Sequence, residues 1–426
     1  MILNNVKINN ELVDILIEDS KIIKIGKSSA KGIDCKGLTA IPAFCDMHTH
    51  LREPGQTAKE DIESGTSAAV AGGYSDVCCM PNTTPVIDTD YMVEYIKLKA
   101  EKVAKCTVHP IGAITKGSNG ELMAEYNKMK DKGAIAFSDD GKPVANPNVM
   151  KQALEYEKDI DAHMLCHCED MALTNGGVAN EGAISTALGL KGIVTASEEL
   201  DIAKQIILAE MLDTKVHICH ISTKGSVQLI REAKTRRVKV SCETCPHYIA
   251  GTEDLIDGYN TFAKVNPPLR TEEDRLAIIE GIKDGTIDCI ATDHAPHTFK
   301  DKHCTFNDAA NGISGLETAF SLCYTYLVKT GEITLDRLVE LMSLNPRKLL
   351  KLQSNEIKEG NVANIALVDL DNKYVIDSNN FKSKGKNTPF NRFEVYGKIV
   401  KTIVNGIIKY EDGVVKWLSI TWLTEF

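Results

Sequence analysis

Long apolar runs are missing from this chain of 426 residues. None approaches the roughly 20 residues that a membrane helix needs. The first residues, Met1 to Lys7, also lack the charged-then-apolar pattern of an export signal. We therefore expect no membrane partner and a location in the cytoplasm.

The chain has fewer basic than acidic residues. The chain has 49 lysines and arginines against 59 aspartates and glutamates, a net charge of −10, and no basic run. Because binding to nucleic acid through phosphate contacts needs a basic surface, we expect no nucleic-acid partner. A small anionic substrate is still compatible with this balance, since one well-placed arginine can hold a carboxylate.

The thirteen cysteines lack the regular spacing of a disulfide framework. Cys242 and Cys245 form a C-x-x-C pair, but it lies in a strand-like run and no second pair accompanies it. With no export signal, we expect reduced thiols that pack in or near the core rather than a zinc ribbon or a redox site.

The middle of the chain alternates between strand-like and helix-like runs. The strand-like runs cover residues 38–45, 74–80, 107–114, 134–138, 162–167, 215–220, 238–242 and 287–292. Helical patterns separate them, for example over 58–71, 90–104, 198–212 and 272–282, and two more follow over 316–328 and 335–343. Eight such units over about 250–300 residues predict an α/β fold of the TIM type, a (β/α)8 barrel. A doubly wound open sheet is the alternative, but no G-x-G-x-x-G follows the first strand.

Both ends of the chain are rich in strand patterns. They cover residues 12–17 and 21–25 near the start, and 362–368 and 399–404 near the end, where Asn405-Gly406 suits a tight hairpin. We expect a small β-sandwich domain built from residues 1–45 and 353–426, around a barrel of residues 46–352. The tail 417–426 has Trp, Leu and Phe with few charges, which suits an interface strand or a mobile end.

Chemistry-bearing residues gather where the predicted strands end. His48 and His50 are two apart, so on a strand both imidazoles share a face and can hold a divalent metal. Taken alone, the pair fits two inert, hydrogen-bonded histidines better than a metal site, because short motifs often match by chance. The residues that end the other strand-like runs lie at the same rim of a barrel. The full set is His48, His50, His167, His220, Asp293 and one of the two adjacent aspartates Asp139 and Asp140.

This ligand set indicates a metal-dependent hydrolase. Imidazole with carboxylate suits Zn²⁺, with Mn²⁺ or Co²⁺ as substitutes. Six ligands exceed the need of one catalytic zinc, and a bridging carboxylate would hold two metals about 3.5–4 Å apart with a hydroxide between them. That hydroxide is a nucleophile for hydrolysis, or its reverse, at a carbonyl. Asp139 and Asp140 are adjacent on a strand, so only one can point inward.

Other histidines fall outside this set. His217 is three residues before His220 and should face the opposite side, as a residue packed between barrel and helices. His294 flanks Asp293 and should point away from it. The spacing does not place His247.

These motifs resemble those of a known family. Residues 46–55 are similar to the D-x-H-x-H-x-R-[DE]-P-G signature of the cyclic amidohydrolases, and most similar to that of the bacterial dihydroorotases. The resemblance continues in the same order to about residue 410, through the segments 80–83, 138–141, 167–170, 266–270 and 291–297. As a set these motifs are highly specific.

The resemblance implies a dihydroorotase, which interconverts L-dihydroorotate and N-carbamoyl-L-aspartate by means of a metal-bound hydroxide in pyrimidine synthesis. It implies two Zn²⁺ ions per subunit. His48, His50 and Asp293 would bind the more buried metal, His167 and His220 the second, and Asp140 would bridge them. Asp293 would also be the catalytic residue that moves the proton. The substrate contacts would be His50, Leu51, Arg52, Asn82, Asn266, His297, Asn311 and Gly312. We also expect a homodimer, and association with aspartate carbamoyltransferase as a further option.

Two rival functions differ from this interpretation at specific residues. Hydantoinases and allantoinases usually carry a carboxylated lysine where this chain has Asp140. Homologues that only scaffold aspartate carbamoyltransferase lose metal ligands, whereas all six are present here. One departure from close dihydroorotases is Asn311-Gly312, where those have Phe-Gly. The long polar loop between His297 and Ile313 suits a lid that orders when substrate binds.

Overall fold

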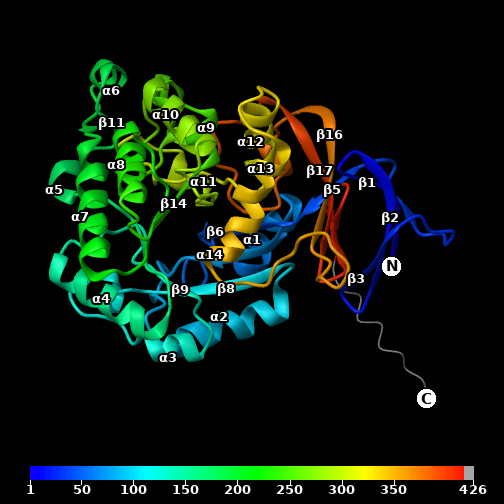
Figure 1. The fold of residues 1–426 in the computed structure, drawn as a ribbon. Helices are drawn as coiled ribbons and strands as arrows, with labels where there is room; N and C mark the ends of the chain where they lie inside the picture. The colour runs from blue at the N-terminus through cyan, green and yellow to red at the C-terminus, as the bar shows by residue number, and fades with distance from the viewer. Residues whose placement is uncertain (417–426) are drawn as a thin grey trace.

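The computed structural model describes residues 1–416, so the predicted tail 417–426 lies outside the described residues. Eight parallel strands form the wall of a barrel (Figure 1). They form two four-stranded sheets, and the bridges Phe137–Met164 and Thr49–His294 join these sheets into a ring. The predicted barrel is therefore confirmed. Its strands are β6 (Phe44–Thr49), β7 (Tyr74–Cys79), β8 (Thr107–Gly112), β9 (Ala136–Phe137), β10 (Leu165–Cys166), β13 (Val216–Ile218), β14 (Val240–Thr244) and β15 (Cys289–Ile290).

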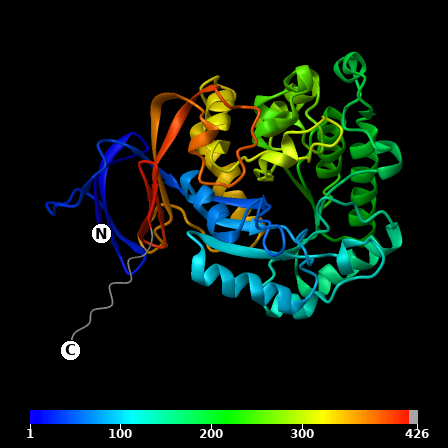
Figure 2. The same cartoon turned by 180° about the vertical axis from the view of Figure 1, so that it is seen from behind.

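Helices cover the outside of this ring (Figures 1 and 2). After each of the first seven strands the main helix is α1 (Ile62–Ala71), α2 (Asp90–Val103), α3 (Tyr126–Asp131), α4 (Pro147–Ile160), α7 (Ala196–Leu212), α8 (Lys224–Thr235) or α10 (Glu272–Lys283). After β15 come α12 (Ala319–Cys323) and α13 (Leu335–Val339), each continued by a π-helical turn, and α14 (Asn345–Leu349). Shorter elements lie in the loops: α5 (Met171–Thr174), β11 (Ala179–Asn180), α6 (Ala183–Leu188), β12 (Gly192–Ile193), α9 (Pro246–Ala250) and α11 (Phe299–Lys302).

Small and sulfur-containing side chains fill the inside of the barrel. Met47, Cys78, Ala136, Cys219 and Cys289 belong to one buried cluster within the ring. All thirteen cysteines lie in the described part of the chain and are free thiols. Burial raises the pKa of Cys289 well above its ordinary value, as expected for an inert core thiol. The cysteines thus act mainly as compact core residues, in agreement with the sequence.

The two ends of the chain form one β-rich domain beside the barrel (Figure 1). Its sheet runs in the order β19-β18-β17-β16-β5-β1-β2-β3, and β4 pairs with β1. Residues from both ends, such as Leu3, Ile15, Leu367 and Ile403, share one buried cluster. The strands are β1 (Ile2–Ile8), β2 (Glu11–Glu18), β3 (Lys21–Gly26), β4 (Ile33–Asp34), β5 (Thr39–Pro42), β16 (Ile365–Val375), β17 (Glu394–Val404), β18 (Ile407–Glu411) and β19 (Val414–Val415).

The run 38–45, predicted as one barrel strand, divides between the two domains. Its first part is β5, which pairs antiparallel with β16 in the terminal sheet, and its last two residues begin β6 of the barrel. Pro42 ends β5; the next amide, of Ala43, donates to Asn364, and the amide of Phe44 donates to Gly73 in the barrel. The chain changes partner within two residues, which an apolar pattern does not reveal. The predicted boundary after residue 45 falls inside β6.

A segment that we call the C-terminal strap, residues 376–393, leaves the terminal sheet between β16 and β17. It crosses to the barrel and returns (Figure 2). Its residues Ser383 and Asn387 are buried against the barrel rim. Through the strap, the terminal domain contacts the rim of the barrel at which the strands end.

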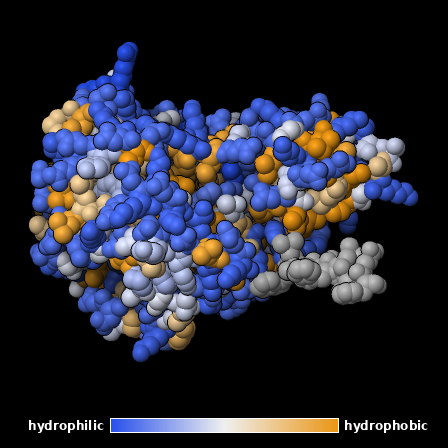
Figure 3. Space-filling view, turned by 90° about the horizontal axis from the view of Figure 1, so that it is seen from below, coloured by the Kyte–Doolittle hydropathy of each residue, from blue (hydrophilic) through white to orange (hydrophobic). Residues whose placement is uncertain are grey.

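The surface of the described residues is mainly hydrophilic on the face seen in Figure 3, with apolar groups gathered over the terminal domain. Leu12, Ile23, Ile407 and Val414 are exposed apolar residues of that domain. No helix in residues 1–416 has the length and apolar character needed to cross a bilayer.

Candidate active site

Two histidines at the end of β6, His48 and His50, direct their Nε2 atoms toward the same carboxylate oxygen of Asp293. The ring of His48 donates from Nδ1 to Glu243 (2.8 Å), and that of His50 donates from Nδ1 to the Asn82 side-chain oxygen (2.9 Å). Both rings therefore turn Nε2, with its lone pair, toward the rim. Nε2 of His50 lies 2.9 Å from Oδ1 of Asp293, and that of His48 lies 3.6 Å from the same oxygen.

The carboxylate of Asp140 lies between the histidines. Its Oδ2 is 3.5 Å from Nε2 of His50, and its Oδ1 is 3.3 Å from Nε2 of His48 and 3.5 Å from Nε2 of His220. The neighbouring Asp139 turns the other way, where its Oδ1 accepts a hydrogen bond from the amide of Thr115 (2.9 Å). Of the two aspartates, Asp140 is therefore the one that faces the other candidate ligands.

His167 and His220 form the opposite side. Nδ1 of His167 lies 3.0 Å from Nε2 of His220, and its own Nε2 donates to Glu169 (3.0 Å). His220 has a φ of +36°, so the chain turns out of the regular strand directly after β13. That turn brings the ring to the rim beside Asp140.

These atoms have the arrangement that a divalent cation needs. Nε2 of His48 and Oδ1 of Asp140 are buried and have no hydrogen-bond partner among the described residues. Burial lowers the pKa of His48, but the carboxylates of Asp140 and Glu243 outweigh it and raise that pKa well above its ordinary value. Burial likewise raises the pKa of Asp140, yet the nearby histidines hold it well below its usual range. Nitrogen and oxygen atoms 3.0–3.6 Å apart around one point have the spacing of ligands that share a divalent cation. The described residues thus fit a metal, with His48–His50–Asp293 and His48–Asp140–His220 as two compact groups.

A cavity of about 140 Å³ opens beside this cluster. Most of the candidate site residues line this cavity. The ring of His297 contacts Arg52, with Nε2 3.3 Å from Nη2 of the guanidinium. Arg52 is buried and donates from Nε to the Pro296 carbonyl (3.3 Å). The lining residues are His50, Arg52, Asn82, Asp140, Gly141, His167, His220, Val265, Asn266, Asp293, Ala295, Asn311 and Gly312.

Known proteins share this sequence and this architecture. Residues 37–226 match the family model described as Dihydro-orotase-like. The dihydroorotase of Acetivibrio thermocellus is 50% identical over 409 residues, 95% of this chain and 96% of that protein. The dihydroorotase of Thermoanaerobacter sp. strain X514 is 51% identical over 402 residues, 93% of each.

The chain belongs to the dihydroorotase family. Among solved structures, the L-hydantoinase (dihydropyrimidinase) of Arthrobacter aurescens has the same fold, with a TM-score of 0.87 and 25% identity. The match covers 98% of this chain and 97% of that one. The metal dependence, the barrel and the terminal β-rich domain expected from the motifs agree with this membership.

Two of the predicted substrate contacts do not line the cavity. Leu51 belongs to the main hydrophobic core and packs on Gly65 of α1. His297 lies one layer back, with Nε2 2.8 Å from the Asn311 carbonyl. Burial and the nearby Arg52 charge lower the pKa of His297 to about 2, so its ring is neutral. The ring of His297 thus lies between Arg52, whose Nη2 is 3.3 Å from Nε2, and the Asn311 backbone; its predicted contact with substrate stays a prediction.

The structure adds supporting carboxylates that the sequence did not single out. Glu243 accepts from His48 and, at 3.2 Å, from His217. Glu169 accepts from His167 and from the side chain of Asn266 (3.0 Å). Their signal in the sequence was weak, because each lies within or just after a strand with no spacing that marks it.

The prediction for His217 was wrong. It was expected to face the helices, but it is buried and its ring contacts Glu243 and Ser241. The alternation that predicted opposite faces for His217 and His220 fails because the strand ends at Ile218. His294 does turn away from the cavity, with Nε2 3.3 Å from Glu60. His247 is buried, and burial lowers its pKa to about 4.

The loop between His297 and Ile313 was expected to be a lid that orders when substrate binds, and this stays a prediction. Although the loop is polar, the side chain of Lys302 within it is buried. Its ammonium donates to the carbonyls of Thr261 (3.1 Å), Lys264 (3.0 Å) and Ala310 (2.6 Å). A polar sequence did not predict this, because three backbone carbonyls can replace the water around a lysine.

Proposed function

We propose that this chain catalyses the reversible interconversion of L-dihydroorotate and N-carbamoyl-L-aspartate, a step of pyrimidine synthesis. One observation carries the proposal: the imidazole–carboxylate cluster and the buried guanidinium of Arg52 border the same cavity of about 140 Å³. The cluster suits hydrolysis of an amide, and the guanidinium suits a substrate that bears a carboxylate. The identity of about half the residues to two proteins named dihydroorotase supports the same substrate.

We assign two divalent metals to the cluster, Zn²⁺ first, with Mn²⁺ or Co²⁺ as substitutes. His48, His50 and Asp293 would hold one, His167 and His220 the other, and Asp140 would contact both. The position of Asp140 supports the shared role, because its carboxylate lies within 3.5 Å of His48 and His50, assigned to one metal, and of His220, assigned to the other. When bound, the metals supply Lewis acidity and lower the pKa of water to give a nucleophile.

The protein residues supply binding and proton transfer. Arg52 would hold the substrate carboxylate through charge-assisted hydrogen bonds. Asn266 and the backbone at Gly312, which also line the cavity, would contact the ring. During hydrolysis Asp293 would take a proton from the attacking water and give it to the ring nitrogen as the C–N bond breaks. In the reverse direction the same carboxylate would accept that proton.

The test uses the full chain and a defined set of substrates. Prolonged chelation should abolish hydrolysis of L-dihydroorotate, and added Zn²⁺ or Mn²⁺ should restore it, with metal content followed by elemental analysis. Hydantoin and dihydrouracil serve as controls for the activity of the structural neighbours, and we expect no comparable turnover of either. Full activity in a metal-free preparation, or a preference for hydantoin, would overturn the proposal.

Other expectations stay predictions of their own. They are the homodimer, the association with aspartate carbamoyltransferase, the cytoplasmic location and the domain boundary after residue 352. Light scattering of the purified chain, alone and mixed with aspartate carbamoyltransferase, tests the first two. A monomer that does not bind the transferase would contradict both.

A further inference from the structure

The C-terminal strap is fixed to the barrel at three places. Glu317 accepts hydrogen bonds from the amides of Lys382 (2.7 Å) and Ser383 (3.0 Å). Glu60 accepts from the hydroxyl of Ser383 and from the amide of Lys384 (3.2 Å). The third place is Asn387, which is buried. Each contact joins residues more than 60 positions apart, so the terminal domain is tied to the rim of the barrel.

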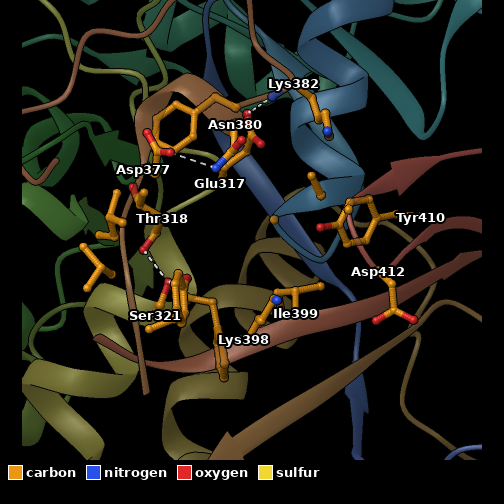
Figure 4. Close-up of a pocket in the computed structure, with 18 residues that line it drawn as sticks. Glu317, Thr318, Ser321, Asp377, Asn380, Lys382, Lys398, Ile399, Tyr410 and Asp412 are labelled. Carbon is orange, nitrogen blue, oxygen red and sulfur yellow. Dashed lines mark hydrogen bonds between the residues drawn. The ribbon is translucent and has the colours of Figure 1, made fainter. Parts of the chain in front are cut away.

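The first attachment borders a cavity of about 470 Å³ at the junction of the two domains (Figure 4). Glu317 and Lys382 lie on its wall, together with Tyr374 and Tyr410. Burial raises the pKa of Glu317 to about 8. This end of the strap is therefore anchored next to an open space, away from the substrate cavity.

Asn387 uses its whole side-chain amide to join two backbone segments. Its oxygen accepts from the amide of His297 (2.9 Å) and from the hydroxyl of Ser314 (2.9 Å). Its nitrogen donates to the carbonyls of Ala295 (3.1 Å) and Gly312 (3.0 Å). All four bonds are buried, and the Asn387 carbonyl accepts a fifth from the amide of Ser314 (2.7 Å).

The two segments that Asn387 joins are residues 295–297 and 311–314. Ala295 and Gly312 line the substrate cavity. Pro296 accepts the hydrogen bond from Arg52, and Asn311 accepts the one from His297. The segments approach so closely that a Cβ on Gly312 would lie 2.6 Å from the Ala295 carbonyl oxygen. A shift of either segment would therefore move the guanidinium and one wall of the cavity together.

We infer that Asn387 is a positioning residue for the substrate side of the site. It sets the separation of the segments 295–297 and 311–314, and through them the place of Arg52, without touching any of the candidate metal ligands. This inference rests on the proposed function. It assigns to the terminal β-rich domain a part in substrate binding, delivered by one side chain of the strap.

Asn387→Ala removes the amide and leaves four buried polar groups without that partner. We expect the KM for L-dihydroorotate to rise by about 10- to 100-fold, with a smaller fall in kcat and unchanged metal content. Asn387→Asp keeps an acceptor for His297 and Ser314 but sets an oxygen against the two carbonyls. It should also raise KM, and it decides the question if Asn387→Ala does not fold.

Asn380→Ala is the matched control, because Asn380 lies in the same strap and, within residues 1–416, its side chain bonds only to Asp377 (3.0 Å). Its kinetic constants should match those of the unmodified chain. A merely structural role predicts a lower melting temperature with unchanged KM in the folded fraction of Asn387 variants, and that result would overturn the inference. If the unmodified chain did not turn over L-dihydroorotate at all, the proposed function would fail instead.

Discussion

The metal-binding half of the cavity rests on barrel strands, whereas the substrate half rests on loops held from outside the barrel. His48 lies at the end of β6 and His167 directly follows β10, and the second ring nitrogens of both donate to buried carboxylates, those of Glu243 and Glu169. Arg52, Asn311 and Gly312 depend on a residue of the strap more than 70 positions further along. We therefore expect substitutions to separate the candidate metal ligands from the Arg52 side of the cavity, although Asn266 and Asn82 are linked to metal ligands through Glu169 and His50.

The largest effect should come from Asp140→Ala. This change removes the carboxylate between four histidines, so at least one metal should be lost and turnover should fall by at least about a thousandfold. Elemental analysis and the hydrolysis assay give both values. Asp139→Ala is the control, because its carboxylate bonds to Thr115 and should leave both metals in place. An empty site in Asp139→Ala together with two metals in Asp140→Ala would reverse the assignment.

Arg52→Ala tests the substrate half without touching the metal half. A charge-assisted hydrogen bond is worth about 1.5–3 kcal/mol, so kcat/KM for L-dihydroorotate should fall by about 10- to 150-fold. Metal content should not change. Unaltered kcat/KM would mean that another group holds the substrate carboxylate, and a loss of metal would mean that the two halves are not separate.

Glu243→Gln should give the smallest effect on activity, since it alters only the support of one ligand. Glu243 is buried, and although burial raises its pKa, bonds to His217 and His48 lower it to about 2. Loss of that charge should weaken metal affinity by about 10- to 100-fold. Activity should recover at excess Zn²⁺, as a titration would show. If activity did not recover at any zinc concentration, Glu243 would contribute to the reaction by more than its support of His48.

The sequence predicted the metal half far better than the substrate half, for a physical reason. In a parallel barrel every strand ends at the same rim, so strand-end histidines and aspartates converge whatever lies between them. His217 shows the limit of that rule, because the strand ends before His220 and alternation no longer applies. Asn387 and Lys302 lie in polar stretches with no periodicity. Their roles depend on contacts with distant carbonyls, which no local pattern encodes.

The strap also has a consequence for how the protein matures on the ribosome. Strand β16 pairs with β5, so residues near 365 must meet residues near 40 before the terminal sheet is complete. Domains emerge and fold from the N-terminus onward during synthesis. A nascent chain that ends just before residue 376 already carries every candidate metal ligand but none of the strap. Metal capture and selective substrate binding would then arise at different moments of biogenesis, with the second waiting for the last strands of the chain.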